Sequence, residues 1–267
     1  MPTRDGPTRE VTVENCRRIV AMLGALDRCV VAFSGGVDSA VVAKAAQLAL
    51  GRNAVAATGT SSSLAEGELD AARRAAEQIG IRHEVLQTEE IADPQYRANA
   101  PDRCFHCKDE LYVRLNALAE RLGGATLVNG ANADDLGDFR PGMKAARQHG
   151  VRSPLAECGV DKAATRQMAL HWGLDVWDKP ATPCLSSRVV YGLEVTPERL
   201  ARIDAAERLL RSLGLDAVRV RCHQDDLARI EAPLDRLAAL CQEPARSKIV
   251  ASLREIGFRY VTLDVEG

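Results

Sequence analysis

The feature that most constrains this chain is a short Ser/Gly loop between an apolar run and a helical pattern. Residues 29–33 (CVVAF) form a continuous apolar run, which is typical of a buried parallel strand. Glycines let a backbone approach phosphate closely, and free N–H groups at a helix start favour an anion. The pattern therefore predicts a phosphate-binding loop, without the lysine of GxxxxGK[ST] loops. The loop consists of Ser34, Gly35, Gly36, Val37, Asp38 and Ser39.

Strand-like and helix-like segments alternate through the first two thirds of the chain. Alternation of this kind predicts a doubly wound parallel sheet, in which ligands bind at the carboxyl ends of the strands. The loops at residues 34–39 and 129–135 both fall at such ends. Further strands are expected at 53–58, 82–87 and 125–129, and helices at 11–26, 40–50, 64–79, 109–122 and 161–172.

After Pro197 the pattern restarts and predicts a second, smaller α/β domain. We place the domains at residues 1–188 and 189–267. The expected elements of the second domain are a helix to residue 213, a strand at 217–222, a short apolar stretch at 227–230, helical segments to 256 and a strand at 259–263.

Charge and cysteine content narrow the function class. The formal net charge is -2, without the basic excess expected of a protein that grips RNA over a long surface, so we expect no nucleic-acid partner. We find no apolar run long enough for a membrane helix and no signal-peptide pattern. Eight cysteines then suggest a reducing cytoplasm, where close cysteine pairs more often bind metal or do chemistry than form disulfides.

A second polar cluster follows the strand expected at 125–129. Residues 129–142 read NGANADDLGDFRPG, with three aspartates within five residues. Carboxylate oxygens of these aspartates, such as that of Asp134, can hold Mg²⁺, and Gly130 can let the backbone approach a nucleotide. The alternative is a solvated turn, because Asn, Asp and Gly favour turns in any case.

Three cysteines have the chemistry expected of sulfur carriers. Cys104 and Cys107 form a CxxC in RCFHCK, and Cys184 lies in a loop rich in proline and small residues. Basic neighbours lower a thiol pKa and favour the thiolate. Three thiolates suit a 4Fe-4S cluster with one open iron, with His106 more a neighbour than a fourth ligand. Unrelated cysteines are the alternative, because a single CxxC is weak evidence.

The second domain contains a pair of arginines in a strand pattern. Arg219 and Arg221 alternate with valines, so their side chains lie on the same strand face. Two neighbouring guanidiniums suit a phosphate or a carboxylate, although a solvated strand face gives the same pattern.

The loop SGGVDS resembles the signature of the PP-loop ATP pyrophosphatases, which include NAD synthetases, GMP synthetases and tRNA thiolases. The run N-G-x-N-x-D-D-x-x-D-x-R-P-G, followed by S-P-L and C-L-S-S-R, resembles the ATP-dependent sulfur transferases that build the nickel-pincer nucleotide cofactor of lactate racemase, the LarE family. The resemblance implies an α/β fold of PP-loop ATP pyrophosphatase type and cleavage of ATP between its α and β phosphates. It adds Arg140 to the nucleotide-binding residues and implies that Asp38 lies close to Mg²⁺ and the phosphates.

The resemblance also implies the reaction and its residues. A carboxylate of pyridinium-3,5-biscarboxylic acid mononucleotide would be adenylylated and then thiolated, twice per substrate. Cys184 would either give up its own sulfur or hold a cluster with Cys104 and Cys107, and the presence of all three favours the cluster. Ser187, Arg188 and Glu207 fall on catalytic positions of the family, and Arg219 and Arg221 on its substrate-phosphate site. A homo-oligomer is implied, with a hexamer as the candidate form.

Two other functions stay open. A tRNA thiolase uses the same ATP chemistry on a base, but needs the RNA-binding surface that the net charge argues against. A non-catalytic nucleotide-binding iron–sulfur module would bind ATP without releasing AMP. An amidotransferase such as NAD synthetase would need ammonia and no set of three cysteines.

Overall fold

The computed structural model describes residues 8–137, 141–215 and 217–267, and divides them into two compact units. Unit 1 consists of residues up to 61, 67–90 and 104–182. Unit 2 consists of residues 62–66, 91–103 and 183–267. The domain boundary predicted at 188/189 stays a prediction. The two compact units divide at 182/183, and two earlier segments of the chain also belong to unit 2. No helix in the described residues has the length and apolar character needed to cross a membrane.

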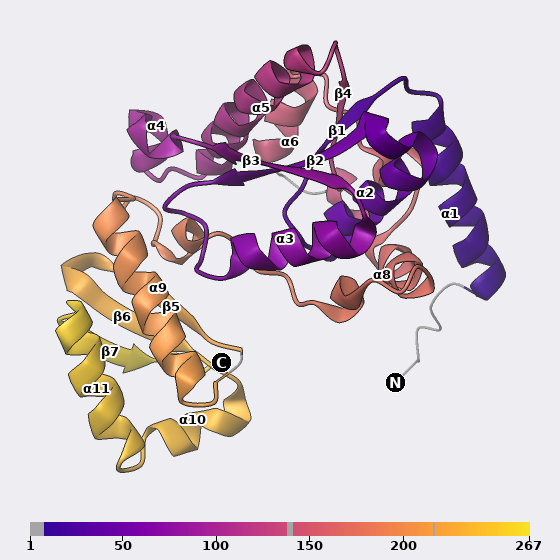
Figure 1. The fold of residues 1–267 in the computed structure, drawn as a ribbon. Helices are drawn as coiled ribbons and strands as arrows, with labels where there is room; N and C mark the ends of the chain where they lie inside the picture. The colour runs from indigo at the N-terminus through magenta and orange to yellow at the C-terminus, as the bar shows by residue number, and fades with distance from the viewer. Residues whose placement is uncertain (1–7, 138–140, 216) are drawn as a thin grey trace. The chain divides into compact units, whose positions relative to one another are not determined.

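Unit 1 contains the predicted parallel sheet (Figure 1). The strand order is β3-β2-β1-β4, all parallel, with Val30 of β1 beside Val55 of β2 and Leu127 of β4. Its elements are α1 (Arg9–Gly24), β1 (Cys29–Ala32), α2 (Val37–Leu50), β2 (Ala54–Thr60), α3 (Glu68–Ile79), β3 (Arg82–Gln87), α5 (Arg103–Arg121), β4 (Thr126–Val128), α6 (Pro141–Gln148), α7 (Pro154–Glu157) and α8 (Lys162–His171).

Helices cover both faces of this sheet, because the strand side chains alternate between two apolar cores. Val31 packs in the core that α1, α2, α3 and α8 share, whereas Val30 packs against α5 and α6. Burial on both faces explains the continuous apolar run of β1. The chain reaches β2 on one side of β1 and β4 on the other. The carboxyl ends of β1 and β4 therefore form the switch point at which doubly wound sheets bind ligands.

Unit 2 is a three-stranded sheet with helices, as the sequence pattern predicts. Strand β5 pairs antiparallel with β6, and β6 pairs parallel with β7. Val220 and Ile230 are fully buried, whereas Arg219, Arg221, Arg229 and Glu231 alternate with them on the other face. The elements are α4 (Pro94–Arg97), α9 (Pro197–Ser212), β5 (Arg219–Cys222), β6 (Leu227–Glu231), α10 (Leu234–Leu240), α11 (Ala245–Ile256) and β7 (Tyr260–Leu263).

Two element boundaries differ from the sequence prediction in ways that matter for the site. Helix α2 begins at Val37 rather than at residue 40, so the Ser/Gly loop leads directly into its first turn. Helix α5 begins at Arg103 rather than at residue 109, so the CxxC lies on a helix. The periodicity of α5 is weak before residue 109, because Cys104 and Lys108 are not apolar core positions.

Candidate functional site

The predicted phosphate loop connects β1 to α2 at the switch point. Gly36 is the N-cap of α2, and no side chain makes a capping hydrogen bond there. The amides of the first helical turn are therefore available to an anion. Gly35 has φ 69°, and a Cβ on it would lie 2.7 Å from the Cα of Ala72. The loop thus requires glycine at this position for both conformation and space.

The two serines of the loop hold its shape. The Ser39 hydroxyl donates to the Gly36 carbonyl (3.0 Å) and accepts from the Ser34 amide (3.2 Å). The Ser34 and Ser39 hydroxyls lie 3.1 Å apart. Val37, the first residue of α2, is buried in the core below. These contacts fix the backbone of the loop before any ligand binds.

The second predicted loop lies directly against the first. A Cβ on Gly130 would lie 2.7 Å from the Ser39 amide nitrogen and 2.8 Å from the Asp38 carbonyl carbon. The Asn132 side-chain amide donates to Asp38 Oδ1 (3.3 Å). Asp134 accepts from the Lys162 backbone amide (3.0 Å). The structure therefore brings Asp38, Gly130 and the neighbourhood of Asp134 together, as strand topology predicts. Arg140 lies outside the described residues.

Asp38 is the electrostatic centre of this edge of the sheet. Burial raises the pKa of its carboxyl, an effect opposed by the Asn132 hydrogen bond and by the charges of Lys162 and Arg166. Both basic residues come from α8, where Arg166 also donates to the carbonyls of Trp177 (2.8 Å) and Lys179 (3.0 Å). Sequence reasoning gave these two residues no role. Their spacing of four on one helix face was the available signal.

The three predicted sulfur-carrying cysteines divide between the units. Cys104 is exposed and Cys107 half-buried, three residues apart on the first turn of α5 in unit 1. Cys184 is exposed and is the N-cap of a 3₁₀ turn, η5 (Leu185–Arg188), in unit 2. Among the described residues no group of three or more His, Cys, Asp or Glu side chains gathers as a metal site. The three-cysteine set stays a prediction.

Other cysteines have the properties of structural residues. Burial raises the pKa of Cys16 to about 11 and that of Cys29 to about 12, and both pack in the core of unit 1. Burial also raises the pKa of the Cys222 thiol. Such thiols stay protonated and unreactive at neutral pH. The solvent-accessible thiols at positions 104, 107 and 184 are the better candidates for chemistry.

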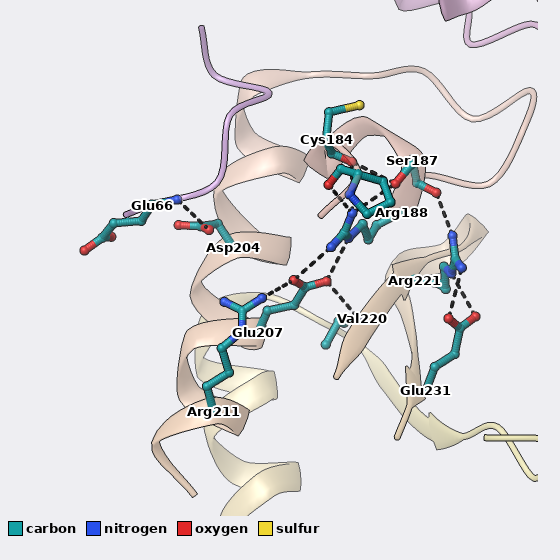
Figure 2. Close-up of polar contacts among 11 residues, drawn as sticks. Glu66, Cys184, Ser187, Arg188, Asp204, Glu207, Arg211, Val220, Arg221 and Glu231 are labelled. Atoms are coloured by element: carbon teal, nitrogen blue, oxygen red, sulfur yellow. Dashed lines mark hydrogen bonds and ion pairs between the residues drawn. The ribbon is translucent and has the colours of Figure 1, made fainter. Parts of the chain in front are cut away.

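The predicted residues Ser187, Arg188 and Glu207 form one hydrogen-bonded network in unit 2, in which Arg188 and Glu207 are buried and Ser187 is half-buried (Figure 2). Arg188 Nε lies 3.0 Å from Glu207 Oε1, with the two side chains 3% and 0% exposed. Arg188 Nη1 donates to Ser187 Oγ (3.1 Å) and to the carbonyls of Pro183 and Cys184. The guanidinium thus holds the turn that carries Cys184.

Glu207 anchors this network from α9. Its carboxylate accepts hydrogen bonds from Arg188, from Arg211 (2.7 Å) and from the Val220 amide (3.1 Å). With every oxygen occupied and no exposed surface, the carboxylate orients Arg188 and ties α9 to β5. Its geometry is that of a positioning residue, and a direct catalytic part for Glu207 stays a prediction.

Arg219 and Arg221 lie on the same face of β5, as predicted, but in different surroundings. Arg221 is paired with both carboxylate oxygens of Glu231 (2.8 and 3.0 Å) and donates to the Ser187 carbonyl (2.7 Å). Arg219 is exposed. Arg221 thus supports the Cys184 turn as well as the strand face, and the exposed Arg219 has the more accessible guanidinium.

Unit 2 also contains a hollow of about 370 Å³ beside these residues. Sequence reasoning missed it, because its walls come from distant parts of the chain. Its lining residues are Arg103, Ser187, Arg188, Val189, Val190, Tyr191, Arg221, His223 and Arg229.

Comparison with known proteins gives matches over different parts of the chain. The family model described as NAD synthase matches residues 10–122. A Synechocystis protein described as uncharacterised is 49% identical over 258 residues, or 97% of this chain and 95% of the relative. The pyridinium-3,5-bisthiocarboxylic acid mononucleotide synthase of Lactiplantibacillus plantarum is 40% identical over 250 residues, or 93% of this chain and 90% of the relative.

A more distant match is to a tRNA-specific 2-thiouridylase, MnmA, of Methylobacterium nodulans. It is 31% identical over 192 residues, which are 57% of this chain and 50% of the relative. The similarity to the synthase therefore extends over far more of both chains than the similarity to the thiouridylase.

Proposed function

The chain belongs to the family of the pyridinium-3,5-bisthiocarboxylic acid mononucleotide synthases, and on that premise we propose that it uses ATP to replace carboxylate oxygen by sulfur on a pyridinium nucleotide. The family resemblance inferred from the sequence motifs is thereby confirmed. The observation that carries the proposal is the synthase match over 93% of the chain, which includes the phosphate loop and the Cys184 turn.

The first half of the proposed reaction, activation of the substrate carboxylate by ATP, is assigned to unit 1. A carboxylate is a poor electrophile, because its leaving group would be oxide. Attack of the carboxylate on the α-phosphate of ATP gives an acyl-adenylate and releases pyrophosphate. We propose that the free amides at the start of α2 hold the phosphates, and that Lys162 and Arg166 neutralise the charge that develops on them.

The donor set of this edge fits a magnesium ion. Asp38 supplies a half-buried carboxylate close to Asn132, and Asp134 lies two residues after Asn132 in the same loop. Such oxygen ligands suit Mg²⁺, which would supply positive charge at the phosphates. Asn132, through its hydrogen bond, would hold the Asp38 carboxylate in the orientation that a ligand requires.

The sulfur half of the reaction depends on the accessible cysteines. Cys104 and Cys184 are exposed and Cys107 is half-buried, and their thiols belong to the ligand class of a 4Fe-4S cluster, which would supply a bound sulfide as nucleophile. The alternative nucleophile is the thiolate of Cys184 itself. Attack of a cluster-bound sulfide on the acyl carbon would expel AMP and leave a thiocarboxylate directly. Attack of the Cys184 thiolate would expel AMP and leave a thioester with the protein. Loss of the Cα proton of Cys184 and cleavage of its Cβ–S bond would then release the thiocarboxylate and leave dehydroalanine. Arg188 and Ser187 would fix the turn during this step.

Substrate binding is proposed for unit 2. Arg219 and Arg221 would bind the substrate phosphate, with Arg219 contributing the more accessible guanidinium. We also propose a homo-oligomer, with a hexamer as the candidate form, which light scattering of the purified chain tests. Accessible free thiols fit a reducing compartment, and the cytoplasm is the proposed location.

One experiment tests the proposed function. The protein is purified without oxygen, its iron and sulfide content is measured, and ATP, Mg²⁺ and the pyridinium dicarboxylate mononucleotide are added. We expect AMP release together with exchange of oxygen for sulfur in the substrate mass. ATP binding without AMP release would instead indicate a non-catalytic module. The mass of Cys184 after turnover separates the two donors, because dehydroalanine there means that this cysteine gave up its sulfur.

The same assay tests the alternative of a tRNA thiolase. That enzyme would release AMP only when tRNA is present. The partial coverage of the thiouridylase match and the net charge of -2 both favour the small-molecule substrate.

A further inference from the structure

The hollow in unit 2 has the size of a small-molecule site. Its volume of about 370 Å³ lies within the range of ligand pockets, and Arg103, Arg188, Arg221 and Arg229 supply a cationic lining. These arginines differ in one respect that decides what the hollow can bind, namely whether a carboxylate of the protein already compensates each charge.

Three of the four arginines have carboxylate partners. Arg188 is paired with Glu207, and Arg221 is paired with Glu231. Arg229 forms ion pairs with Asp264 and, at 3.2 Å, with Glu231. The charges of these side chains are therefore largely satisfied within the protein.

Arg103 is the exception. It is 4% exposed, and its Nη1 donates to two neutral oxygens, the side-chain carbonyl of Asn99 and the backbone carbonyl of Ser186 (2.7 Å). None of the ion pairs found within the described part of the chain includes Arg103. A buried cation without a counter-charge is costly. Since Arg103 lines the hollow, a bound anion is the partner that would compensate it.

Tyr191 adds an aromatic wall to the hollow. Its side chain is 62% exposed, and the Arg103 guanidinium carbon lies 5.9 Å from its ring centroid. The backbone on both sides of Tyr191 is fixed by Asn99, which donates to the Val190 carbonyl (2.8 Å) and accepts from the Gly192 amide (3.1 Å). An accessible, fixed aromatic ring beside an uncompensated cation suits a flat ligand that carries an anionic group.

We propose that Arg103 binds a carboxylate on the substrate ring while Tyr191 stacks against that ring. The inference rests on the proposed function, because it takes the pyridinium dicarboxylate mononucleotide as the ligand. A carboxylate fits better than the phosphate, because its single charge matches the single uncompensated cation. In a reaction carried out twice on one ring, Arg103 holds the acidic group that is not reacting.

The test compares two mononucleotides that differ at the proposed contact. Nicotinic acid mononucleotide and nicotinamide mononucleotide share ring, ribose and phosphate, and differ in carboxylate against carboxamide. Binding of each to the full chain is measured by titration calorimetry. We expect the intact protein to prefer the carboxylate form by about 10-fold or more, as for a hydrogen bond to a charged group. Arg103→Gln should abolish the preference, and Arg103→Lys should keep part of it.

Tyr191→Ala should weaken the binding of both mononucleotides by the same factor, since stacking of the ligand ring on Tyr191 does not depend on the carboxylate. Tyr260→Ala is the control, because Tyr260 is an exposed tyrosine of unit 2 that does not line the hollow. Thermal unfolding of each variant shows whether it is folded. A folded Arg103→Gln that keeps the preference for the carboxylate overturns the proposal. A folded Arg103→Gln that binds both mononucleotides more weakly by the same factor also overturns the proposal, because that result would place the phosphate at Arg103.

The result is distinguishable from a failure of the proposed function, because binding requires no turnover. AMP release by the intact protein with the dicarboxylate substrate, combined with an unchanged preference in Arg103→Gln, would sink the assignment of Arg103 alone. Absence of AMP release would sink the proposed function.

Discussion

Asp38 illustrates a conflict between stability and activity at a single residue. Burial raises the pKa of its carboxyl, so the ionised form is disfavoured in the folded chain relative to the unfolded chain. The cost is therefore present at neutral pH, shrinks as the pH falls through the raised pKa and is absent below the ordinary pKa of an aspartate in the unfolded chain. This carboxylate is also the proposed partner of the phosphates and Mg²⁺, for which it must be ionised.

We predict that Asp38→Asn stabilises the ligand-free protein at neutral pH and reduces AMP release by about 100-fold or more, as for loss of a charge-stabilising group. Thermal unfolding at pH 7 and at pH 4 measures the first effect, which should shrink at the lower pH. AMP release from the intact protein should fall as the pH drops through the raised pKa. A variant less stable than the intact protein at pH 7 would contradict the argument.

Replacement of Glu207, in contrast to replacement of Asp38, should destabilise the folded protein. Glu207→Gln leaves the buried Arg188 with neutral partners alone, and breaking a buried ion pair costs about 3–5 kcal/mol. We expect a loss of that size in urea unfolding, with lower activity because the Cys184 turn loses its support. Glu14→Gln is the matched control, since its pair with Arg17 is exposed and 3.9 Å long. Equal losses in both variants would refute the positioning part of Glu207.

Residues of the site differ in how far sequence reasoning could find them. Asp38 and Gly35 belong to one short motif between a strand and a helix, so local pattern suffices. Arg103 carries no such pattern, because its significance comes from what it lacks, a carboxylate partner. That property appears only when residues 99 and 186 are placed around its side chain.

At the scale of elements, the loops after β1 and β4 pack directly against each other at the proposed ATP site. Gly130 lies against the backbone of Asp38 and Ser39, where a Cβ would come within 2.8 Å of both residues. These contact atoms belong to the backbone, which cannot move aside as the end of a flexible side chain can. The two loops would have to separate, which would disturb the amides that we propose to hold the phosphates.

We therefore predict that Gly130→Ala weakens ATP binding by about 10-fold or more, in line with a displaced preorganised site. Gly137→Ala in the same loop is the control, because its Cβ would meet nothing within 4 Å and its φ is not in the left-handed region. Titration of each variant with ATP measures the difference. Equal affinities in both variants would show that the close packing of Gly130 is not needed for nucleotide binding.

Elements were predictable where their apolar period was strong. Strand β1 falls within the continuous apolar run of residues 29–33, and the parallel order places the two loops at one edge of the sheet. Helix α5 begins six residues earlier than its periodicity indicates, because its first turn carries cysteines and basic residues rather than core positions. Where cysteines and basic residues occupy the end of a helix, the apolar periodicity that would indicate its boundary is missing from the sequence.

At the scale of the molecule, unit 2 is built from three stretches of chain that no sequence pattern joins. Asn99 is fully buried with φ 54°, and its side-chain amide donates to the carbonyls of Val189, Val190 and Leu193. These contacts link residues 90 to 94 positions apart in the sequence. Local periodicity carries no information on such pairings, so the predicted boundary at 188/189 rested on the restart of the pattern alone.

The contribution of the earlier segments can be tested by cutting the chain. A fragment of residues 189–267 lacks Arg188, which pairs with Glu207, and lacks Asn99, which satisfies three carbonyls of the following turn. We predict that this fragment shows no cooperative urea transition, whereas the full chain does. A fragment of residues 183–267 regains Arg188 but not Asn99, and should show partial helical structure with a broad transition. Far-UV circular dichroism during the titration distinguishes these cases. A sharp transition in the 189–267 fragment, at the same urea concentration as in the full chain, would contradict this prediction. In that case the C-terminal sheet and its helices would fold cooperatively by themselves, and residues 91–103 and Arg188 would not be needed for the stability of unit 2.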